Sequence, residues 1–443
     1  GAVGIICTCT GILLAVLALA CGAAAGRELV FDVVAHGARG DGATDDTKVR
    51  DVSGGLTRRR VLTFNSVSFL WFLALKQAFE AAWAAACGAR GPSASMVVPA
   101  RRSFLVGPVS FKGPCASARI TVQILGKIMA PPATAKAWRS GGNKHQQWLM
   151  FYRVDGLRVT GNGVLDGNGQ SWWIRRCSDI ALKLVGCNNL ELGGFSSKDS
   201  PQMHIAILES SGVNVWGLTI TAPGNSPNTD GIHVGRSQNV RITSSRIGTG
   251  DDGISISSGS RFVTVDGVQC GPGHGVSIGS LGKNGAAAAV EYVDVKNVHF
   301  TNTMNGARIK TWEGGRGYAR SISFTNMEFD NVDNPVLIDQ FYTASTSKIP
   351  ISATKCILLI NSSVTCGQLG VAISNITYTN LRGTSSRPTA VSFVCGGGGG
   401  GGCRDIHVNS MVITGSGGRR TVALCRNAKV ATSGHVYPQI PCS

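Results

Sequence analysis

The chain has 443 residues, including 59 glycines, and only 15% of its residues are charged. Its formal net charge at pH 7 is +17, which fits a polyanionic partner: nucleic acid, an acidic polysaccharide or a membrane surface. The sequence contains no zinc-finger motif and no combined aromatic and basic surface, which argues against nucleic acid.

Residues 5–25 form a nearly uninterrupted apolar block that ends in small residues. This pattern predicts a secretory signal peptide over residues 1–25, with cleavage near Ala25. A membrane anchor is the alternative, because a span needs roughly 20 apolar residues. The 14 cysteines indicate an oxidising compartment, so we expect a secreted protein whose mature form has no membrane segment.

The residues after the signal peptide predict a strand and then a helix. Residues 30–42 have a strand pattern that ends in a glycine turn. Thr44 and the acidic residues after it suit the start of a helix, and residues 78–87 form its expected body. Residues 49–77 separate these two parts. We expect a short helix at the N-terminal end of the fold.

From residue 97 onward, short runs of alternating apolar and polar residues indicate strands rather than helices. The pattern apolar-x-apolar-x-x-apolar-x-apolar recurs at residues 213–220, 263–270, 293–300, 322–329 and 406–413. Repeats of roughly 22 to 30 residues made of short strands are typical of a solenoid, whereas a propeller blade needs about 40. We therefore predict an all-β fold, a parallel β-helix.

Three phrases of the form x-Gly-apolar-x-apolar are led by Asp230, Asp252 and His274 at a constant spacing of 22 residues. A fourth phrase, in the same frame, carries Arg308 and Lys310. Equivalent residues of neighbouring coils in a parallel β-helix lie about 4.8 Å apart. We therefore expect the first three residues to form an outward-facing column, with the two cations one coil beyond.

Asp251 adds a third carboxylate to this column. Clustered carboxylates suit general acid and base chemistry, because like charges raise the pKa of one member, and glycoside hydrolysis uses such a pair. A calcium site is the alternative for the carboxylates, whereas no Cys or His cluster has zinc-ligand spacing. A solvated turn is the commoner use of Asp251-Asp252 alone. Both can face outward only if residues 248–250 make a turn.

Two further features concern packing. Trp172 and Trp173 could stack on a sugar, but core packing is the favoured use of such a pair. Cys395 and Cys403 flank a glycine-rich loop and could close it as a disulfide.

Four short motifs resemble, in the same order, those of polygalacturonases, glycoside hydrolase family 28: Asn228-Thr229-Asp230, Gly250-Asp251-Asp252, Gly273-His274-Gly275 and Arg308-Ile309-Lys310. Flanking segments such as GVLDGNGQSWW and CGPGHGVSIGSLG are similar to the sequences of the plant members. The resemblance begins near residue 30 and reaches the C-terminus. It implies a single catalytic domain over residues 26–443, a right-handed parallel β-helix that hydrolyses α-1,4-galacturonan with inversion and needs no metal or other cofactor.

The resemblance also implies catalytic roles. Asp251 would be the general acid, and His274 would support its protonation state. Asp230 and Asp252 would hold and activate the attacking water.

The same resemblance assigns the substrate contacts. Arg308 and Lys310 would bind galacturonate carboxylates, and Asn228 and Tyr342 would line the groove. The expected partner is an acidic polysaccharide, pectin or homogalacturonan, which suits the basic chain. We expect a monomer that acts outside the cell, in the cell wall.

The sequence departs from the family pattern at three places. The family usually has Cys directly after the paired Asp, bridged to the Cys that here is Cys270, but Gly253 stands at that position. Residues 49–77 interrupt the N-terminal helix, and residues 344–369 interrupt the passage after Tyr342. We hypothesise that both segments are insertions or errors in the gene model, the first being an intron translated in frame.

Two other functions stay open. A non-catalytic pectin-binding protein or inactive homologue would account for Gly253 and the two interrupting segments. A polysaccharide lyase on a similar solenoid would need calcium and a basic proton abstractor, and the ordered Asp and His column argues against it.

Overall fold

The computed structural model of the chain describes residues 28–42, 78–135, 138, 147–174, 179–343, 370–397 and 402–442. The predicted signal peptide, the expected helix start at Thr44 and the two suspected insertions, residues 49–77 and 344–369, lie outside these ranges. Within them, none of the helices combines the length and the hydropathy needed to span a membrane.

Two large sheets of parallel strands make up the fold. The eleven-stranded sheet contains β4 (Val109–Lys112), β7 (Gln147–Tyr152), β10 (Ile180–Val185), β13 (Ile205–Leu208), β16 (Ile232–Gly235), β19 (Ile254–Ile256), β22 (Val276–Leu281), β24 (Asn305–Thr311), β26 (Asn334–Asp339), β28 (Thr389–Val394) and β30 (Val422–Arg426). The twenty-stranded sheet contains β1 (Leu29–Asp32), β2 (Ser93–Val98), β3 (Ser103–Leu105), β5 (Arg119–Ile124), β6 (Lys127–Met129), β8 (Leu157–Thr160), β9 (Val164–Asp166), β11 (Leu190–Gly193), β12 (Ser196–Lys198), β14 (Ser211–Trp216), β15 (Thr219–Thr221), β17 (Gln238–Thr243), β18 (Arg246–Gly248), β20 (Ser260–Asp266), β21 (Gln269–Cys270), β23 (Ala287–Thr301), β25 (Arg316–Val332), β27 (Ala372–Ser385), β29 (Cys403–Gly415) and β31 (Ala428–Tyr437). Helical structure is found in residues 78–88, in α3 (Gln170–Trp173) and in the 3₁₀ turn η2 (Lys283–Gly285).

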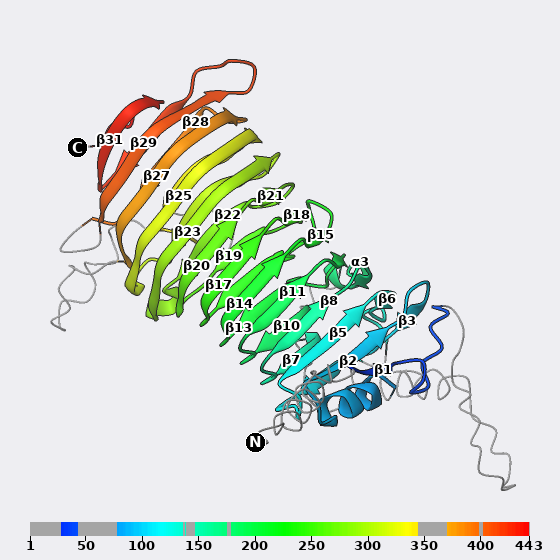
Figure 1. Cartoon of the computed structure of the whole chain (residues 1–443). Helices are drawn as coiled ribbons and strands as arrows, with labels where there is room; N and C mark the ends of the chain where they lie inside the picture. Colours follow the sequence, from blue (N-terminus) through cyan, green and yellow to red (C-terminus); the bar gives the residue numbers. More distant parts are fainter. Residues whose placement is uncertain are drawn as a thin grey trace, which may run out of the picture.

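Each central coil contributes one strand to the eleven-stranded sheet and two to the twenty-stranded sheet. The strands β16, β17 and β18 form one such coil, and each pairs in parallel with its counterpart β19, β20 or β21 in the next coil. Figure 1 shows the coils stacked along one axis, from β1 and β2 beside the N-terminal helix to β31 at the other end. The predicted parallel β-helix is confirmed.

The apolar positions of the recurring pattern line the inside of the solenoid. Val213, Val215, Leu218 and Ile220 are at most 2% exposed, and the equivalent residues of the later coils are also buried. Each coil therefore buries its apolar side chains against its two neighbours, which is how a solenoid reaches this length without one large central core.

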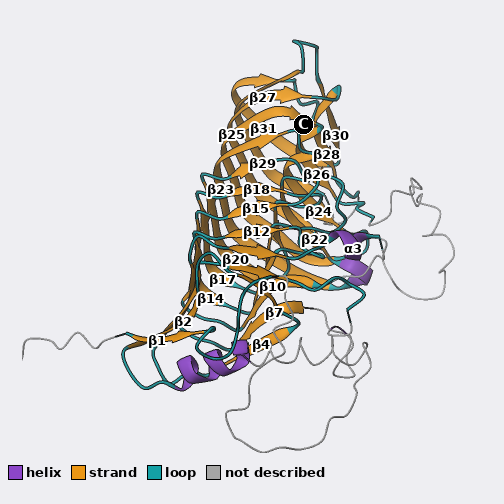
Figure 2. Cartoon of the chain, turned by 90° about the vertical axis from the view of Figure 1, so that its right-hand side faces the viewer, coloured by secondary structure: helices purple, strands orange, loops and turns teal. Residues whose placement is uncertain are grey.

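The N-terminal helix covers one end of the solenoid, beside β2 and β4, as the second view shows (Figure 2). Its Phe79 and Trp83 are buried, and the Trp83 ring lies 5.3 Å from Phe111 and 5.4 Å from Phe151, measured between ring centroids. A disulfide from Cys87, near the end of the helix, ties it to the loop after β4. The expected capping helix is confirmed.

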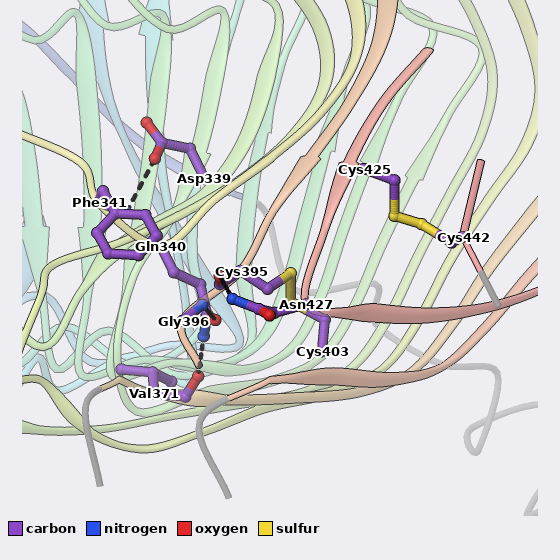
Figure 3. The surroundings of a disulfide bond; sticks show 10 residues. All are labelled: Asp339, Gln340, Phe341, Val371, Cys395, Gly396, Cys403, Cys425, Asn427 and Cys442. Atoms are coloured by element: carbon purple, nitrogen blue, oxygen red, sulfur yellow. Dashed lines mark hydrogen bonds between the residues drawn. A yellow bond between two sulfur atoms is a disulfide. The ribbon is translucent and has the colours of Figure 1, made fainter. Parts of the chain in front are cut away.

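Hydrogen bonds join the described residues that precede residues 344–369 to those that follow them. The Gln340 side chain donates a hydrogen bond to the Val371 carbonyl oxygen (2.7 Å) and accepts one from the Gly396 N–H (2.7 Å). Figure 3 shows these hydrogen bonds beside the disulfide between Cys395 and Cys403. This disulfide confirms the pairing that the sequence predicts for the glycine-rich loop. The solenoid thus holds its register across the interrupting segment.

Trp172 packs against the protein rather than presenting a ring to solvent. It is 4% exposed and meets Trp138 edge to face, with 4.6 Å between the ring centroids. Trp173 donates a hydrogen bond from its ring nitrogen to the Ser200 carbonyl oxygen (3.0 Å). Packing, the favoured use of this pair, is what the structure shows.

Candidate active site

Asp251 and Asp252 leave the solenoid in the turn between β18 and β19. Residues 249–253 contain no strand, so the turn that the sequence required is present. A Cβ on Gly250 would lie 2.0 Å from the Ser226 carbonyl oxygen, and the turn can approach the neighbouring coil this closely only because glycine lacks that atom. Because Asp251 and Asp252 lie in this turn and not in a strand, their side chains do not have to point to opposite faces.

The predicted column is present in the strand register. The third residues of the phrases led by Asp230, Asp252 and His274 are direct partners in β16, β19 and β22. Arg308 lies in the next strand, β24, as the partner of Ser277. Asp230 and Asp252 are only 8% and 2% exposed, because side chains of neighbouring coils cover their outward side. The column is therefore mostly buried, which the sequence did not indicate.

Asp252 is the centre of a buried charge cluster. Its carboxylate accepts hydrogen bonds from the Lys310 Nζ (2.7 Å) and the Ser277 hydroxyl (2.8 Å), and it forms an ion pair with the Arg308 guanidinium. Burial alone would raise the pKa of Asp252, but the charges of Arg308 and Lys310 outweigh it and hold the pKa at about 2. Asp252 is therefore a fixed negative charge at any physiological pH.

Asp230 has the opposite electrostatic environment. Burial raises the pKa of Asp230 well above its usual range, and the nearby charges of Asp252 and Asp251 raise it further. The Ser255 hydroxyl donates to its Oδ2 (2.7 Å), and the His233 Nδ1 lies 2.8 Å from the Ser255 Oγ. One carboxyl of the cluster is thus biased toward the protonated form while its neighbour stays ionised, as expected for like charges in one site.

Asp251 and His274 form the accessible side of the cluster. The His274 Nδ1 lies 3.1 Å from the Asp251 Oδ1, and the two side chains are 25% and 24% exposed. The Asp251 backbone carbonyl accepts the His274 N–H (2.7 Å), which fixes the two turns to each other. His274 also lines a pocket of about 250 Å³ together with Met304 and Asp333. A ligand outside the solenoid would therefore meet these two side chains before the buried ones.

The expected substrate-binding residues lie in different surroundings. Arg308 and Lys310 are 7% and 5% exposed and are already engaged by Asp252. Tyr342 is half-buried, and its ring centroid lies 5.1 Å from the Lys310 Nζ, so the structure brings it into the cluster. Asn228 is exposed in the turn before β16, two residues ahead of Asp230.

Sequence reasoning missed the hydroxyl residues Ser255 and Ser277. Both are at most 2% exposed, and each donates a hydrogen bond to one carboxylate of the column, Asp230 or Asp252. In the repeated x-Gly-apolar-x-apolar phrase they occupy the second x, between the two apolar residues. Because the apolar residues on either side point inward, alternation places this x on the outer face. A serine there in two successive repeats is the signal that could have identified them.

The arrangement also bears on the metal alternative. One ligand atom each from Asp251, Asp252 and His274 lies within 4.8 Å of the others, which is compact enough for a cation. Asp252, however, already has two positively charged partners, Arg308 and Lys310, and a metal ion would have to compete with both. The donor set therefore fits a charge-neutralised carboxylate better than a calcium site.

Cys270 is buried and unpaired directly behind the turn of the paired aspartates. Burial raises the pKa of the Cys270 thiol to about 12. A Cβ on Gly253 would lie 3.1 Å from the Cys270 Sγ, close to the roughly 3 Å between a Cβ and the partner sulfur in a disulfide. The structure thus confirms that Cys270 has no bridge and leaves room for one.

We expect the substitution Gly253→Cys to form a disulfide with Cys270 and to raise the free energy of unfolding by about 3 kcal/mol, the value for a closed loop of this size. Urea unfolding with and without reductant measures the gain. The double variant Gly253→Cys/Cys270→Ser should gain nothing. Equal stability of the oxidised and reduced single variant would contradict the expectation.

Sequence comparison finds relatives over most of the chain. The family model described as glycosyl hydrolases family 28 matches residues 87–434. A probable polygalacturonase of Arabidopsis thaliana is 41% identical over 407 residues, covering 91% of this chain and 78% of the relative. An exopolygalacturonase of Platanus acerifolia is 38% identical over 381 residues, covering 83% of this chain and 94% of the relative.

Solved structures share the fold. An endo-xylogalacturonan hydrolase from Aspergillus tubingensis superimposes with a TM-score of 0.68 at 21% identity, covering 92% of this chain and 99% of that one. A polygalacturonase from Erwinia carotovora ssp. carotovora gives a TM-score of 0.60 at 22% identity, covering 77% and 90% of the two chains. At these identities the similarity supports the parallel β-helix.

Proposed function

The chain belongs to glycosyl hydrolases family 28, and on this premise we propose that it is a polygalacturonase that hydrolyses the α-1,4-galacturonosyl linkages of pectin with inversion. One observation carries the proposal: Asp230, Asp251, Asp252 and His274 gather on three consecutive coils, with two buried cations on the fourth. The opposite pKa shifts of Asp230 and Asp252 suit a site that keeps one carboxyl protonated and its neighbour ionised.

In the proposed mechanism Asp251 protonates the glycosidic oxygen. It is the accessible carboxyl of the cluster, and His274 beside it orients the carboxyl and supports its protonation. Asp252, kept ionised by Arg308 and Lys310, accepts the proton of the attacking water. Asp230, protonated through its burial, holds that water by a hydrogen bond. Water attacks as the leaving sugar departs, which inverts the anomeric carbon.

Arg308 and Lys310 have two tasks in this proposal. They hold the charge of Asp252, and they present N–H groups to a galacturonate carboxylate at the same place. Tyr342 and Asn228 line the groove at either side of the column. The substrate is an acidic polysaccharide, and the net charge of +17 favours its approach. We place the enzyme outside the cell, in the cell wall, as a secreted monomer.

The test uses the chain without residues 1–25, expressed with and without residues 49–77, on polygalacturonate. New reducing ends and ultraviolet absorbance of the product are followed together, with Asp251→Asn as the control. Hydrolysis gives reducing ends without an absorbing product, and the control abolishes them. An absorbing, calcium-dependent product would mean a lyase. Binding of polygalacturonate without cleavage by a folded chain would mean a non-catalytic homologue.

A further inference from the structure

One backbone position in each of these coils has a left-handed conformation. It lies within β14, β17, β20, β23, β25, β27 and β29, directly before the first inward apolar residue of the recurring pattern. The register makes these positions equivalent from coil to coil. The occupants, with φ between +53° and +69°, are Gly212, Asn239, Phe262, Tyr292, Ser321, Asn375 and Asp405. Glycine and asparagine adopt this conformation readily, whereas bulky residues rarely do. Two successive coils therefore carry an aromatic residue where the backbone disfavours one.

Core packing does not account for these two aromatic residues. Phe262 and Tyr292 are 46% and 48% exposed. Their rings stack on each other, nearly parallel at 3°, with 4.9 Å between the centroids, which is about the spacing of adjacent coils. A large residue in the left-handed region costs on the order of 1–3 kcal/mol unless its surroundings compensate. The fold would be satisfied by asparagine, as at Asn239 and Asn375, so the exposed ring pair points to a ligand.

The charge beside the rings indicates which ligand. The Arg261 guanidinium carbon lies 5.7 Å from the centre of the Phe262 ring, and two N–H groups of Arg261 donate to the Gln238 Oε1 (2.9 and 2.7 Å). Among the described residues, Arg261 has no carboxylate partner. The one carboxylate in the neighbouring coil at this level, Glu291, accepts from Arg320 instead (2.8 Å). The Arg261 guanidinium is therefore held beside the ring pair and has further N–H groups that can donate to a ligand.

We propose that Phe262, Tyr292 and Arg261 form a second, non-catalytic contact for the galacturonan chain, which we call the aromatic ledge. Aromatic rings pack against the C–H faces of sugars, and a guanidinium binds the carboxylate that distinguishes a uronate from a neutral sugar. Asp252 lies two residues before β19, and Phe262 lies in β20, the next strand of the same coil, which belongs to the twenty-stranded sheet. The catalytic column and the ledge therefore lie on the same coils, on either side of the strand from the eleven-stranded sheet.

The ledge deepens the proposed function and rests on it for the identity of the polymer. A polymer long enough to reach both places binds with an effective concentration that a short oligomer does not gain. Loss of the ledge should therefore weaken the binding of the polymer and leave the cleavage of short oligogalacturonides unchanged. This split distinguishes a second binding place from a change in the catalytic column.

The double variant Phe262→Asn/Tyr292→Asn tests the ledge, because asparagine suits the left-handed backbone and should preserve or raise stability. In the Asp251→Asn background, which removes cleavage, binding to polygalacturonate should weaken about tenfold. With Asp251 intact, kcat/KM on polygalacturonate should fall while kcat/KM on a trigalacturonide stays constant. Arg261→Gln should weaken the binding of polygalacturonate and leave any binding of neutral galactan unchanged. Ser321→Asn, at the equivalent position one coil further, is the matched control.

Unchanged polymer binding by the folded double variant would overturn the ledge. So would an equal loss of activity on polymer and trigalacturonide, because that result would indicate a disturbed catalytic column. A change of oligomeric state in sedimentation would assign the ring pair to a contact between two copies. Wild-type chain that binds polygalacturonate through the ledge without cleaving it would overturn the proposed hydrolysis and leave the ledge standing.

Discussion

The substitution Asp252→Asn is expected to abolish hydrolysis and to lower the free energy of unfolding by about 3–5 kcal/mol, the range measured when one partner of a buried ion pair is removed. Arg308 and Lys310 are both buried, and the asparagine would leave them without a counter-charge. The loss should be largest at neutral pH. Because the folded pKa of Asp252 is about 2, its stabilising contribution is present above the unfolded pKa of about 4 and is lost as the pH falls toward 2.

The matched variant Asp230→Asn should change stability in the opposite direction. Asp230 has a raised pKa, so it favours folding below its unfolded pKa of about 4, and this contribution is lost as the pH rises. Its replacement by a neutral amide should therefore stabilise the fold at neutral pH while hydrolysis is lost. Urea unfolding of the three proteins at pH 7 and pH 4 measures both signs. Destabilisation of similar size by the two variants at pH 7 would contradict the assignment of opposite charge states.

The second large effect is expected for Asp251→Asn, which should reduce kcat on polygalacturonate by about 10² to 10⁴-fold, the usual contribution of a general acid. Stability should change by no more than about 1 kcal/mol, because the charged partner of Asp251 is the partly exposed His274 rather than a buried cation. Asparagine also keeps the oxygen that accepts the Asp252 N–H (2.8 Å). The measurement is kcat from reducing ends, together with thermal unfolding. Retention of more than a tenth of the activity would exclude Asp251 as the proton donor.

The fold and the column could be predicted from the sequence, because in a solenoid residues one repeat period apart are paired in neighbouring coils. The constant spacing of the phrases led by Asp230, Asp252 and His274 places these residues at equivalent points of adjacent coils, and the strand pairing has that register. The same reasoning identified the inward apolar positions, since alternation in short strands decides which side chains are buried.

The contacts between side chains of different coils could not be predicted in this way. The sequence shows that Arg308 and Lys310 lie one coil beyond His274, but not that both reach across two coils to Asp252. Ser255 and Ser277 escaped notice because a single hydroxyl between apolar residues is common. The disulfide between Cys425 and Cys442 was equally hidden, because cysteine positions alone allow many pairings.

The charges around Asp252 do not cancel. Two buried cations face one ionised carboxylate, and Asp230 beside them is biased toward its neutral form. Counted over these four buried groups alone, the surplus is one positive charge, which an anionic sugar unit would neutralise when it binds. Ionisation of Asp230 at higher pH would supply that negative charge from within the protein. The carboxylate of an acidic substrate and ionised Asp230 would therefore compensate the same positive charge, so substrate binding is expected to weaken as the pH rises through the pKa of Asp230.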